Sequence, residues 1–474
     1  MNIGLIDPGS KKIILNENFP HLGLAYIAAY LEKHGHSVKI LDLSLEGEVG
    51  IDSFMECGLD IVGFSATSFT FARTTELAKR VKAYDGKIIT VVGGPHVSIG
   101  METVLEDSSI DYAVCGEGEM TTLDLVDLLQ RDRKPGTASL SEIPGLLFRD
   151  DDGRIVVNPI RPRIKQLDDL PFPAFHLFQM DKYGIYPLLT SRGCPYGCTF
   201  CSIKAIWGTQ WRYRSPENII TEVNEASDKF NWTDKPFSII DDSFNIIPER
   251  IEAFCTYITE RKIDIEWFSA GFRADKISLP LAGKMKEAGC IGVSIGIESA
   301  NNAILRRIKK KETIEDIEKG CQNLFQAGIP VQAQFMIGNP GDTLETVKES
   351  IEFARRQKFS SVAFYLALPY PKTELWDYVK THGTFLREDY MQFHHFSDEP
   401  VFETPEFSVA DRSEAYALGR KLSIKTKLND EMRTKLRRFR RLDFEGLSTK
   451  RIGKAAVRVA KHFLDLSLNR KEKV

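Results

Sequence analysis

Residues Ser191–Cys201 read Ser-Arg-Gly-Cys-Pro-Tyr-Gly-Cys-Thr-Phe-Cys and contain three of the eight cysteines of this 474-residue chain. Cys194, Cys198 and Cys201 are separated by three and then two residues, and the next cysteine is Cys255. Closely spaced thiolates are the ligands of iron–sulfur clusters. Three cysteines would leave one iron without a protein ligand, which indicates a place where a substrate or cofactor binds.

Zinc is the alternative metal for this triplet of cysteines. A structural zinc site takes four ligands, usually from two pairs of cysteines or histidines. The chain has no second pair, and the nearest histidine, His176, lies upstream in a proline-rich stretch. A disulfide is disfavoured because low cysteine usage without a signal peptide predicts a reducing cytoplasm.

The composition limits the classes of protein that need to be considered. A hydrophobic fraction of 42% can supply cores for two or three domains. The net charge of -3 gives no reason to expect nucleic acid as a partner. No apolar run approaches the ~20 residues of a membrane-spanning helix. We therefore expect a cytoplasmic protein without a nucleic-acid partner.

Residues 1–150 alternate short apolar runs with amphipathic helical patterns. Gly23–His34, for example, carries one apolar face and precedes Gly35, which predicts a helix that ends there. Buried strands are predicted at 2–6, 38–41, 60–64, 88–92 and 112–114. This alternation predicts a doubly wound, Rossmann-like parallel sheet.

Small and polar residues follow several of these predicted strands. They are Ser65, Thr67, Gly93, Gly94, Gly116 and Glu117. Ligands of doubly wound sheets bind at the carboxyl ends of the strands, and small residues there let a large flat ligand approach the backbone. Glycines after strands are also ordinary turns, so this pattern alone does not identify a ligand.

A second domain is predicted after a linker over residues 151–182, which contains Pro159, Pro162, Pro171 and Pro173. Strand–helix alternation resumes over residues 183–385. The six predicted strands are 187–190, 237–240, 267–270, 292–297, 331–337 and 361–368. Six such units predict a partial (β/α)6 barrel, whose reactive groups gather at the carboxyl ends of its strands.

The cysteine spacing resembles the signature of the radical S-adenosylmethionine (SAM) superfamily. That resemblance implies a 4Fe–4S cluster on the three cysteines, whose open iron binds SAM. One electron then cleaves SAM to a 5′-deoxyadenosyl radical. It further implies an electron donor such as flavodoxin or ferredoxin.

The first domain resembles the cobalamin-binding domain of many radical SAM enzymes. His21–Leu31 matches its first helix, and Gly93–His96 and Gly116–Glu119 match its later loops. Cobalamin is therefore expected at the residues that follow the strands. The Asp-x-His-x-x-Gly motif of other cobalamin proteins is absent, and His96 lacks the preceding aspartate, so His96 is not assigned as a ligand.

The same resemblance implies roles in the barrel for several residues. Tyr196 or Phe200 would lie near the adenine, and Arg273 would meet the SAM carboxylate. Asp241 and Asp242 would accept from the SAM amino group, Glu298 would bind the ribose hydroxyls, and the glycines around Pro340 would lie near the adenine. The alternatives are structural: helix caps, a surface ion pair and a charge at a helix start.

Residues 386–474 are expected to be mostly helical and to close over the substrate. His394 and His395 are adjacent, which makes them a weak candidate for metal binding. Arg433–Arg441 is a basic run, and 452–465 reads as a basic amphipathic helix. Such a helix either lies on an anionic membrane surface or, more commonly, packs on its own domain.

The resemblance implies a cobalamin-dependent radical SAM enzyme that methylates an unactivated carbon of a small-molecule or lipid-like substrate. A cyclase of the anaerobic porphyrin-ester type and a sugar diol dehydratase share the same layout, with or without cobalamin. An alternative of another class is a non-catalytic iron–sulfur or zinc module.

Overall fold

The computed structural model describes residues 1–9, 19–101, 103–232, 235–394 and 397–441. Contacts between residues divide the chain into two units, Met1–Ser423 and Ile424–Val474. The first unit contains both large sheets. No helix in the described ranges is long and apolar enough to cross a membrane.

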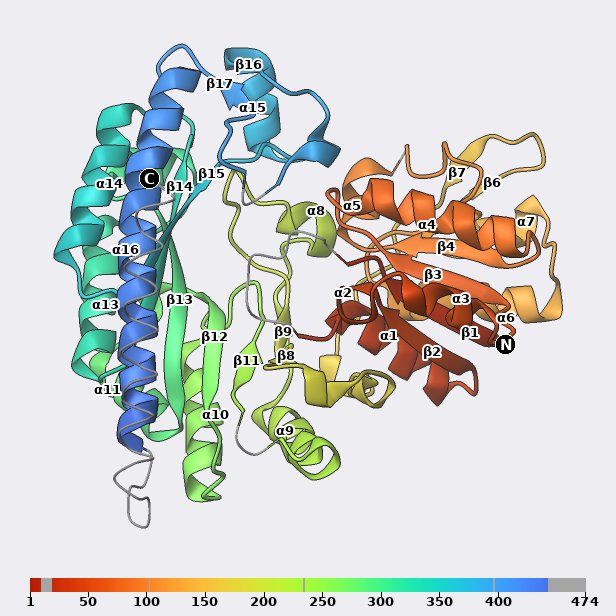
Figure 1. The fold of residues 1–474 in the computed structure, drawn as a ribbon, viewed down its shortest axis with the longest axis horizontal. Coiled ribbons are helices and arrows are strands. Elements are labelled where there is room, and N and C mark those ends of the chain that lie inside the picture. Colours follow the sequence, from red (N-terminus) through yellow and green to blue (C-terminus); the bar gives the residue numbers. More distant parts are fainter. Residues whose placement is uncertain (10–18, 102, 233–234, 395–396, 442–474) are drawn as a thin grey trace, which may run out of the picture. The chain divides into compact units, whose positions relative to one another are not determined.

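The first sheet has seven strands in the order β2-β1-β3-β4-β5-β6-β7 (Figure 1). The strands are β1 (Asn2–Asp7), β2 (Ser37–Asp42), β3 (Ile61–Ser65), β4 (Ile89–Gly93), β5 (Tyr112–Val114), β6 (Leu146–Arg149) and β7 (Ile155–Val157). β1 to β5 pair in parallel, as predicted, whereas β6 and β7 add an antiparallel hairpin. The hairpin was not expected, and it carries the sheet past residue 150.

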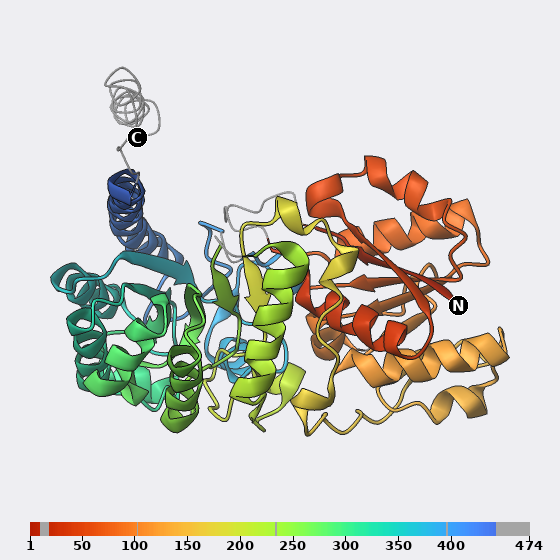
Figure 2. The ribbon, with the colours of Figure 1, turned by 90° about the horizontal axis from the view of Figure 1, so that it is seen from below.

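Helices cover both faces of this sheet (Figure 2). They are α1 (Leu22–Lys33), α2 (Leu43–Glu46), α3 (Val49–Met55), α4 (Phe71–Tyr84), α5 (Pro95–Gly100), α6 (Gly118–Arg131) and α7 (Thr137–Ser141). One buried cluster joins the sheet to α3, α4 and α5, and a second joins it to α1, α6 and α7. The doubly wound arrangement is therefore confirmed.

The second sheet has six parallel strands in the order β15-β14-β13-β12-β11-β8. They are β8 (Tyr186–Leu188), β11 (Phe237–Ile239), β12 (Trp267–Phe272), β13 (Cys290–Glu298), β14 (Val331–Ile337) and β15 (Ser361–Leu366). β13 is buried or half-buried along its whole length, which is typical of a central parallel strand. The predicted partial barrel is confirmed.

Most helices of the barrel flank its sheet, whereas α8 (Ile203–Trp207) lies beside α5 of the first domain (Figure 1). The others are α9 (Pro216–Phe230), α10 (Pro248–Glu260), α11 (Leu279–Glu287), α12 (Asn302–Arg307), α13 (Ile314–Gln326), α14 (Leu344–Arg356) and α15 (Glu374–His382). α13 shows why these segments are helical. Thr313 and Asp316 form a capping box at its start, and Ile317, Cys321 and Leu324 are buried on one face.

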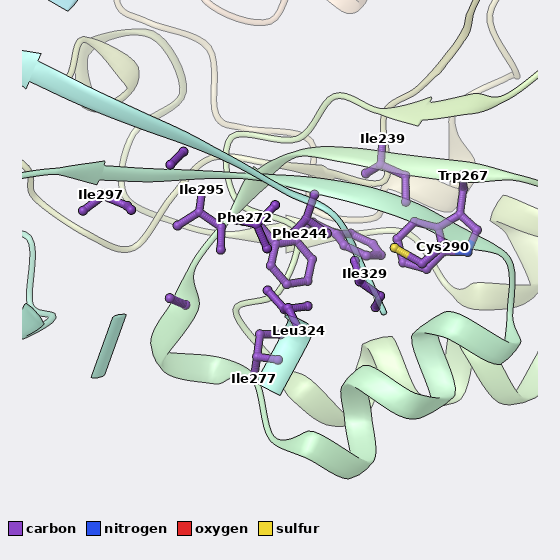
Figure 3. Packing of buried hydrophobic residues seen from close by; sticks show 14 of the residues in the cluster. Ile239, Phe244, Trp267, Phe272, Ile277, Cys290, Ile295, Ile297, Leu324 and Ile329 are labelled. Atoms are coloured by element: carbon purple, nitrogen blue, oxygen red, sulfur yellow. The ribbon is translucent and has the colours of Figure 1, made fainter. Parts of the chain in front are cut away.

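Figure 3 shows the apolar core on which the strands of the barrel rest. Trp267 is fully buried, and its indole nitrogen donates to the carbonyl of Ala288 at 2.8 Å. Phe244 packs edge-on against this ring, with ring centroids 5.9 Å apart. A buried tryptophan with its N–H satisfied makes this layer rigid, so the carboxyl ends of the strands have a fixed base.

Two short ribbons and one long helix complete the strands and α-helices of the described residues. They are the ribbon of β9 (Ser191–Arg192) and β10 (Arg212–Tyr213), the ribbon of β16 (Thr384–Phe385) and β17 (Phe402–Glu403), and the helix α16 (Val409–Arg441). The side chains of the basic run that ends α16, His395 and the segment 452–465 lie outside the described residues. The predicted membrane contact of the tail therefore stays a prediction.

Candidate functional site

The cysteine loop leaves the barrel through a sharp turn at Gly193. The φ angle of Gly193 is 86°, and a Cβ atom there would lie 2.5 Å from the carbonyl oxygen of Gln210. Only glycine fits this position. The loop with the three cysteines follows at once and leads into α8, whose last residue is Trp207.

Cys194, Cys198 and Cys201 are half-buried free thiols. Burial raises the pKa of each thiol, and that of Cys201 to about 12. Such a thiol becomes a ligand when a metal takes up the charge of the thiolate. Within the described ranges, no three His, Cys, Asp or Glu side chains converge as the ligands of a single ion do. The loop fits a cluster, in which each cysteine binds a different iron.

The two aspartates after β11 point in different directions. The carboxylate of Asp242 accepts from the N–H of Gly193 at 3.1 Å, and burial raises its pKa to about 6. The carboxylate of Asp241 is fully buried and accepts from the N–H of Thr190 at 2.7 Å and the hydroxyl of Ser191 at 2.6 Å. Asp241 therefore supports the strand that leads into the cysteine loop, and its predicted contact with SAM stays a prediction.

Arg273, which follows β12, holds two neighbouring loops together. Its guanidinium donates to the carbonyl oxygens of Lys310 at 3.0 Å and Lys311 at 3.1 Å, and to Asp275 at 3.0 Å. The same group stacks on the ring of Tyr196 at 3.7 Å. Its contacts are thus within the protein, and binding of the SAM carboxylate by Arg273 is not tested by this geometry.

Glu298 and Lys310 form a charged pair that the sequence did not reveal. Lys310 Nζ lies 3.4 Å from Glu298 Oε1, and Lys310 is the one buried lysine in the described part of the chain. Burial favours its neutral form, but Glu298 and Glu312 hold the pKa of Lys310 above its ordinary value. Glu298 itself has a φ of 67°, which is a strained conformation typical of functional loops. A lysine within a run of three is usually exposed, so its burial had no local signal.

Phe200 connects the cysteine loop to the segment after the barrel. Its ring packs on a hydrophobic cluster that includes Phe393 and Phe402. The N–H of Leu375, at the start of α15, donates to the carbonyl of Thr199 at 2.9 Å. The segment after the barrel thus closes onto the loop, and the predicted position of Phe200 beside the adenine stays a prediction.

The residues predicted to hold cobalamin line one cavity of about 330 Å³ in the first domain. They are Ser65, Thr67, Gly93, Gly94, Gly116 and Glu117. The cavity continues between the sheet and the apolar faces of α1 and α6. Gly94 has a φ of 96°, and a Cβ there would lie 2.8 Å from the carbonyl oxygen of Ala66. This small-residue wall fits a flat ligand that carries its own polar groups.

His96 is not directed at this cavity as a ligand. Its ring is fully buried, stacks on Phe71 with centroids 4.1 Å apart, and shares a hydrogen bond of 3.2 Å between Nδ1 and Ser68 Oγ. Burial lowers its pKa to about 4. Tyr390, from the segment after the barrel, lies on the same ring at 6.0 Å.

Barrel residues form one side of the cobalamin-type cavity. Leu189, Arg192, Ile206 and Trp207 belong to its lining and flank the cysteine loop in sequence. Glu117 meets the barrel there, because its carboxylate pairs with Arg192 at 2.9 Å. Burial opposes ionisation, but Arg192 and Arg212 hold the pKa of Glu117 below its usual range.

Two family models match the chain, the radical SAM superfamily over residues 188–354 and the B12 binding domain over residues 15–126. An uncharacterized methyltransferase of Pyrococcus horikoshii is 32% identical over 424 residues, which cover 85% of this chain and 90% of that relative. The chain belongs to the radical SAM superfamily. Its first domain places this radical SAM protein in the group with a B12 binding domain, as predicted.

Other relatives of this radical SAM protein carry specific names. The cytidylyl-2-hydroxyethylphosphonate methyltransferase of Streptomyces wedmorensis is 30% identical over 420 residues, covering 75% of this chain and 76% of that relative. The solved radical SAM methyltransferase TsrM of Kitasatospora setae, with cobalamin and a [4Fe-4S] cluster bound, has a TM-score of 0.66 at 18% identity. The match covers 79% of this chain and 73% of that one, and it shows the shared fold.

This radical SAM protein is a cobalamin-dependent enzyme with a 4Fe–4S cluster, SAM and cobalamin as cofactors. The predicted family, enzyme class and cofactors are confirmed. The structure brings Asp242, Arg273 and Glu298 to the cysteine loop, which contains Tyr196. Their contacts with SAM stay predictions. Arg192 was missed because its partners are distant in sequence, and Lys310 was missed because its burial has no local signal.

Proposed function

We propose that this radical SAM enzyme transfers a methyl group to an unactivated carbon of a small organic molecule. The observation that carries the proposal is the shared wall between its two cofactor regions. Arg192 precedes the cysteine loop, Trp207 follows it, and both line the cavity of the cobalamin-type domain. A methyl carrier in the cavity would lie beside SAM on the cluster, so both could reach one substrate carbon.

When the cofactors are bound, the cluster supplies the electron that cleaves SAM and cobalamin carries the methyl group. The protein binds, orients and shields them. Gly94 and its neighbours admit a flat ligand, Asp242 orients the cysteine loop, and the apolar wall that continues to α1 and α6 excludes water. In this proposal Tyr196, Phe200, Arg273 and Glu298 surround SAM, and a flavodoxin or ferredoxin delivers the electron.

The names of relatives support methyl transfer over the other reactions. Two relatives at 30% identity or above are named methyltransferases. The alternative is cyclisation, because the anaerobic magnesium-protoporphyrin IX monomethyl ester cyclase of Rubrivivax gelatinosus is 29% identical over 379 residues, covering 76% of this chain and 66% of that relative. Methyl transfer and cyclisation differ in their SAM coproducts, which makes them separable without the substrate.

The test is anaerobic reconstitution with iron, sulfide and cobalamin, followed by reduction and addition of SAM that carries a deuterated methyl group. Methyl transfer predicts deuterated methylcobalamin on the protein together with S-adenosylhomocysteine. A cyclase or a diol dehydratase predicts 5′-deoxyadenosine without S-adenosylhomocysteine. A non-catalytic module predicts that SAM is recovered intact.

A further inference from the structure

Arg192 joins the cysteine loop to the cobalamin-binding domain through two buried ion pairs. Its Nη1 atom lies 2.9 Å from Glu117 Oε1, and its Nη2 atom lies 2.6 Å from Glu119 Oε1. The three side chains are at most 4% exposed. Removal of one partner from such a pair leaves an uncompensated buried charge, so the two domains are held at this point.

A second arginine contacts one of these two carboxylates, that of Glu117. Arg212 lies directly opposite Arg192 in the β9–β10 ribbon, and its Nη1 atom contacts Glu117 at 2.9 Å. It also donates to the carbonyl oxygen of Ile164 at 2.7 Å. The ribbon therefore brings two positive charges to the two negative charges at the N-terminal end of α6. The charges of the four side chains cancel.

Aromatic rings from both domains fix the plane of the Arg192 guanidinium. The ring of Tyr26, on α1, lies 5.2 Å from it, and the ring of Trp207, at the end of α8, lies 5.4 Å from it. Cation–π contacts add to the ion pairs in a desolvated site. The guanidinium is thus restrained by ion pairs and by aromatic faces, and it has little freedom to shift.

The chain between Arg192 and the first cluster ligand is stiff. One residue, Gly193, separates Arg192 from Cys194, and its left-handed φ and its hydrogen bond to Asp242 fix its conformation. On the other side, Glu117 belongs to the lining of the cobalamin-type cavity. The ion pair therefore connects a residue of the cavity wall to a cluster ligand through very few bonds.

We propose that Arg192 is a positioning residue that fixes the cluster loop relative to the cobalamin cavity. It keeps the distance between the cluster and cobalamin constant. Methyl transfer to a common substrate carbon depends on this distance. The inference rests on the proposed function in one respect, because it requires that both cofactors bind. Arg192 acts through Glu117, Glu119 and the loop, and it does not touch the reacting atoms.

The test compares Arg192→Lys with the wild type and with Arg161→Lys. Arg161 also pairs with α6, through Asp124 and Thr121, but both of those partners lie on α6 within the first domain. The reduced cluster and cob(II)alamin each carry unpaired spin, so their magnetic interaction in EPR spectra reports their separation. We expect Arg192→Lys to retain iron and cobalt at wild-type levels. Its magnetic interaction between cluster and cobalt should be weaker, with a broader distribution of their separations. Arg161→Lys should match the wild type.

The other outcomes separate this inference from the proposed function. A fully loaded Arg192→Lys protein with the wild-type interaction overturns the inference and leaves methyl transfer intact. A loaded wild type without a magnetic interaction also overturns it. If Arg192→Lys does not fold, Glu119→Gln removes one ion pair and leaves Glu117 in place; it should weaken the interaction, and an unchanged spectrum rejects the inference. A wild type that binds no cobalamin rejects the proposed function itself.

Discussion

The parallel strands of the two large sheets end in chemically different residues. At the carboxyl ends of β3 and β4, small neutral residues such as Ser65 and Gly93 line an apolar cavity. At the carboxyl ends of β11 and β12, Asp241 and Arg273 are ionisable and buried, and their polar atoms are used by neighbouring backbone and side chains. The first sheet offers a backbone surface to a ligand, whereas the second builds a rigid mount for a metal-binding loop.

This difference predicts how each domain responds to substitution. A ligand that brings its own polar groups needs space, so added volume is harmful in the first domain. A loop held by buried charges needs its partners, so lost hydrogen bonds are harmful in the barrel. The following substitutions test whether the two halves respond separately.

The largest effect is expected from Cys198→Ala. Loss of one of three thiolates removes a cluster ligand, so the reconstituted protein should lose its iron and all reductive cleavage of SAM. Cobalamin binding, measured by absorption after gel filtration, should remain at the wild-type level because the cavity is untouched. Cys255→Ala is the control, since Cys255 is buried in the barrel core. Cleavage of SAM by Cys198→Ala would contradict the assignment of the cluster.

Asp241→Asn should lower the free energy of unfolding by about 1–3 kcal/mol, because an amide group replaces one of the two oxygens that accept hydrogen bonds from Thr190 and Ser191 and leaves a buried donor without its acceptor. The iron content should also fall, because Asp241 supports Thr190 and Ser191, which lead into the cysteine loop. Urea unfolding and iron analysis measure the two effects. Asp264→Asn, at an exposed position, is the control. Wild-type stability together with weakened SAM binding would instead make Asp241 a direct SAM ligand.

Sequence patterns predicted the parts of this molecule that depend on local order. The alternation of strands and helices, the cysteine spacing and the glycines after β4 are all short-range signals, and the sheets and the cavity wall followed from them. The β6–β7 hairpin was missed because its two strands are short and lie beside a segment interpreted as linker. The expected strand ends were correct to within a few residues because buried parallel strands are continuous apolar runs.

Long-range charge pairing was beyond reach of the sequence. Arg192 and Glu117 are 75 residues apart, and nothing near either residue identifies its partner. Lys310 is buried although lysine favours the surface, because Glu298 and Glu312 compensate its charge. The orientation of the Asp241 carboxylate depends on Thr190 and Ser191, which donate hydrogen bonds to it. Such features arise when the elements pack, and no local pattern carries them.

Gly93→Ala should weaken cobalamin binding about tenfold, or roughly 1.4 kcal/mol, while the fold stays intact. The nearest atom to a Cβ at this position is the carbonyl oxygen of Val114 at 3.7 Å, so the methyl group fits the protein but occupies the cavity wall. Titration with cobalamin measures the affinity. Gly136→Ala is the control, because a Cβ there meets open space away from the cavity. Unchanged affinity would place the ligand away from β4.

A change in pH should affect the stability of the two halves with opposite sign. Burial lowers the pKa of His96, in the first domain, to about 4, below its unfolded value of about 6.5. Between these values the unfolded chain binds a proton that the folded chain refuses, so acid destabilises this domain. Burial raises the pKa of Asp342, in the barrel, to about 6, above an unfolded value of about 3.9. There the folded chain binds the proton first, so acid stabilises the barrel.

Comparison of each residue with a non-titrating substitute isolates its contribution. From pH 7 to pH 5 the wild type should lose about 1–2 kcal/mol of unfolding free energy relative to His96→Gln, and gain about 1–2 kcal/mol relative to Asp342→Asn. Hydrogen bonds from Thr346, Asn339 and Gly338 favour the ionised form of Asp342, so its pKa is shifted less than that of His96 and the second value is the smaller one. Urea unfolding at both pH values measures the differences. If both differences change in the same direction, burial does not determine the pKa values of His96 and Asp342. The contrast between the two halves then does not hold for these buried residues.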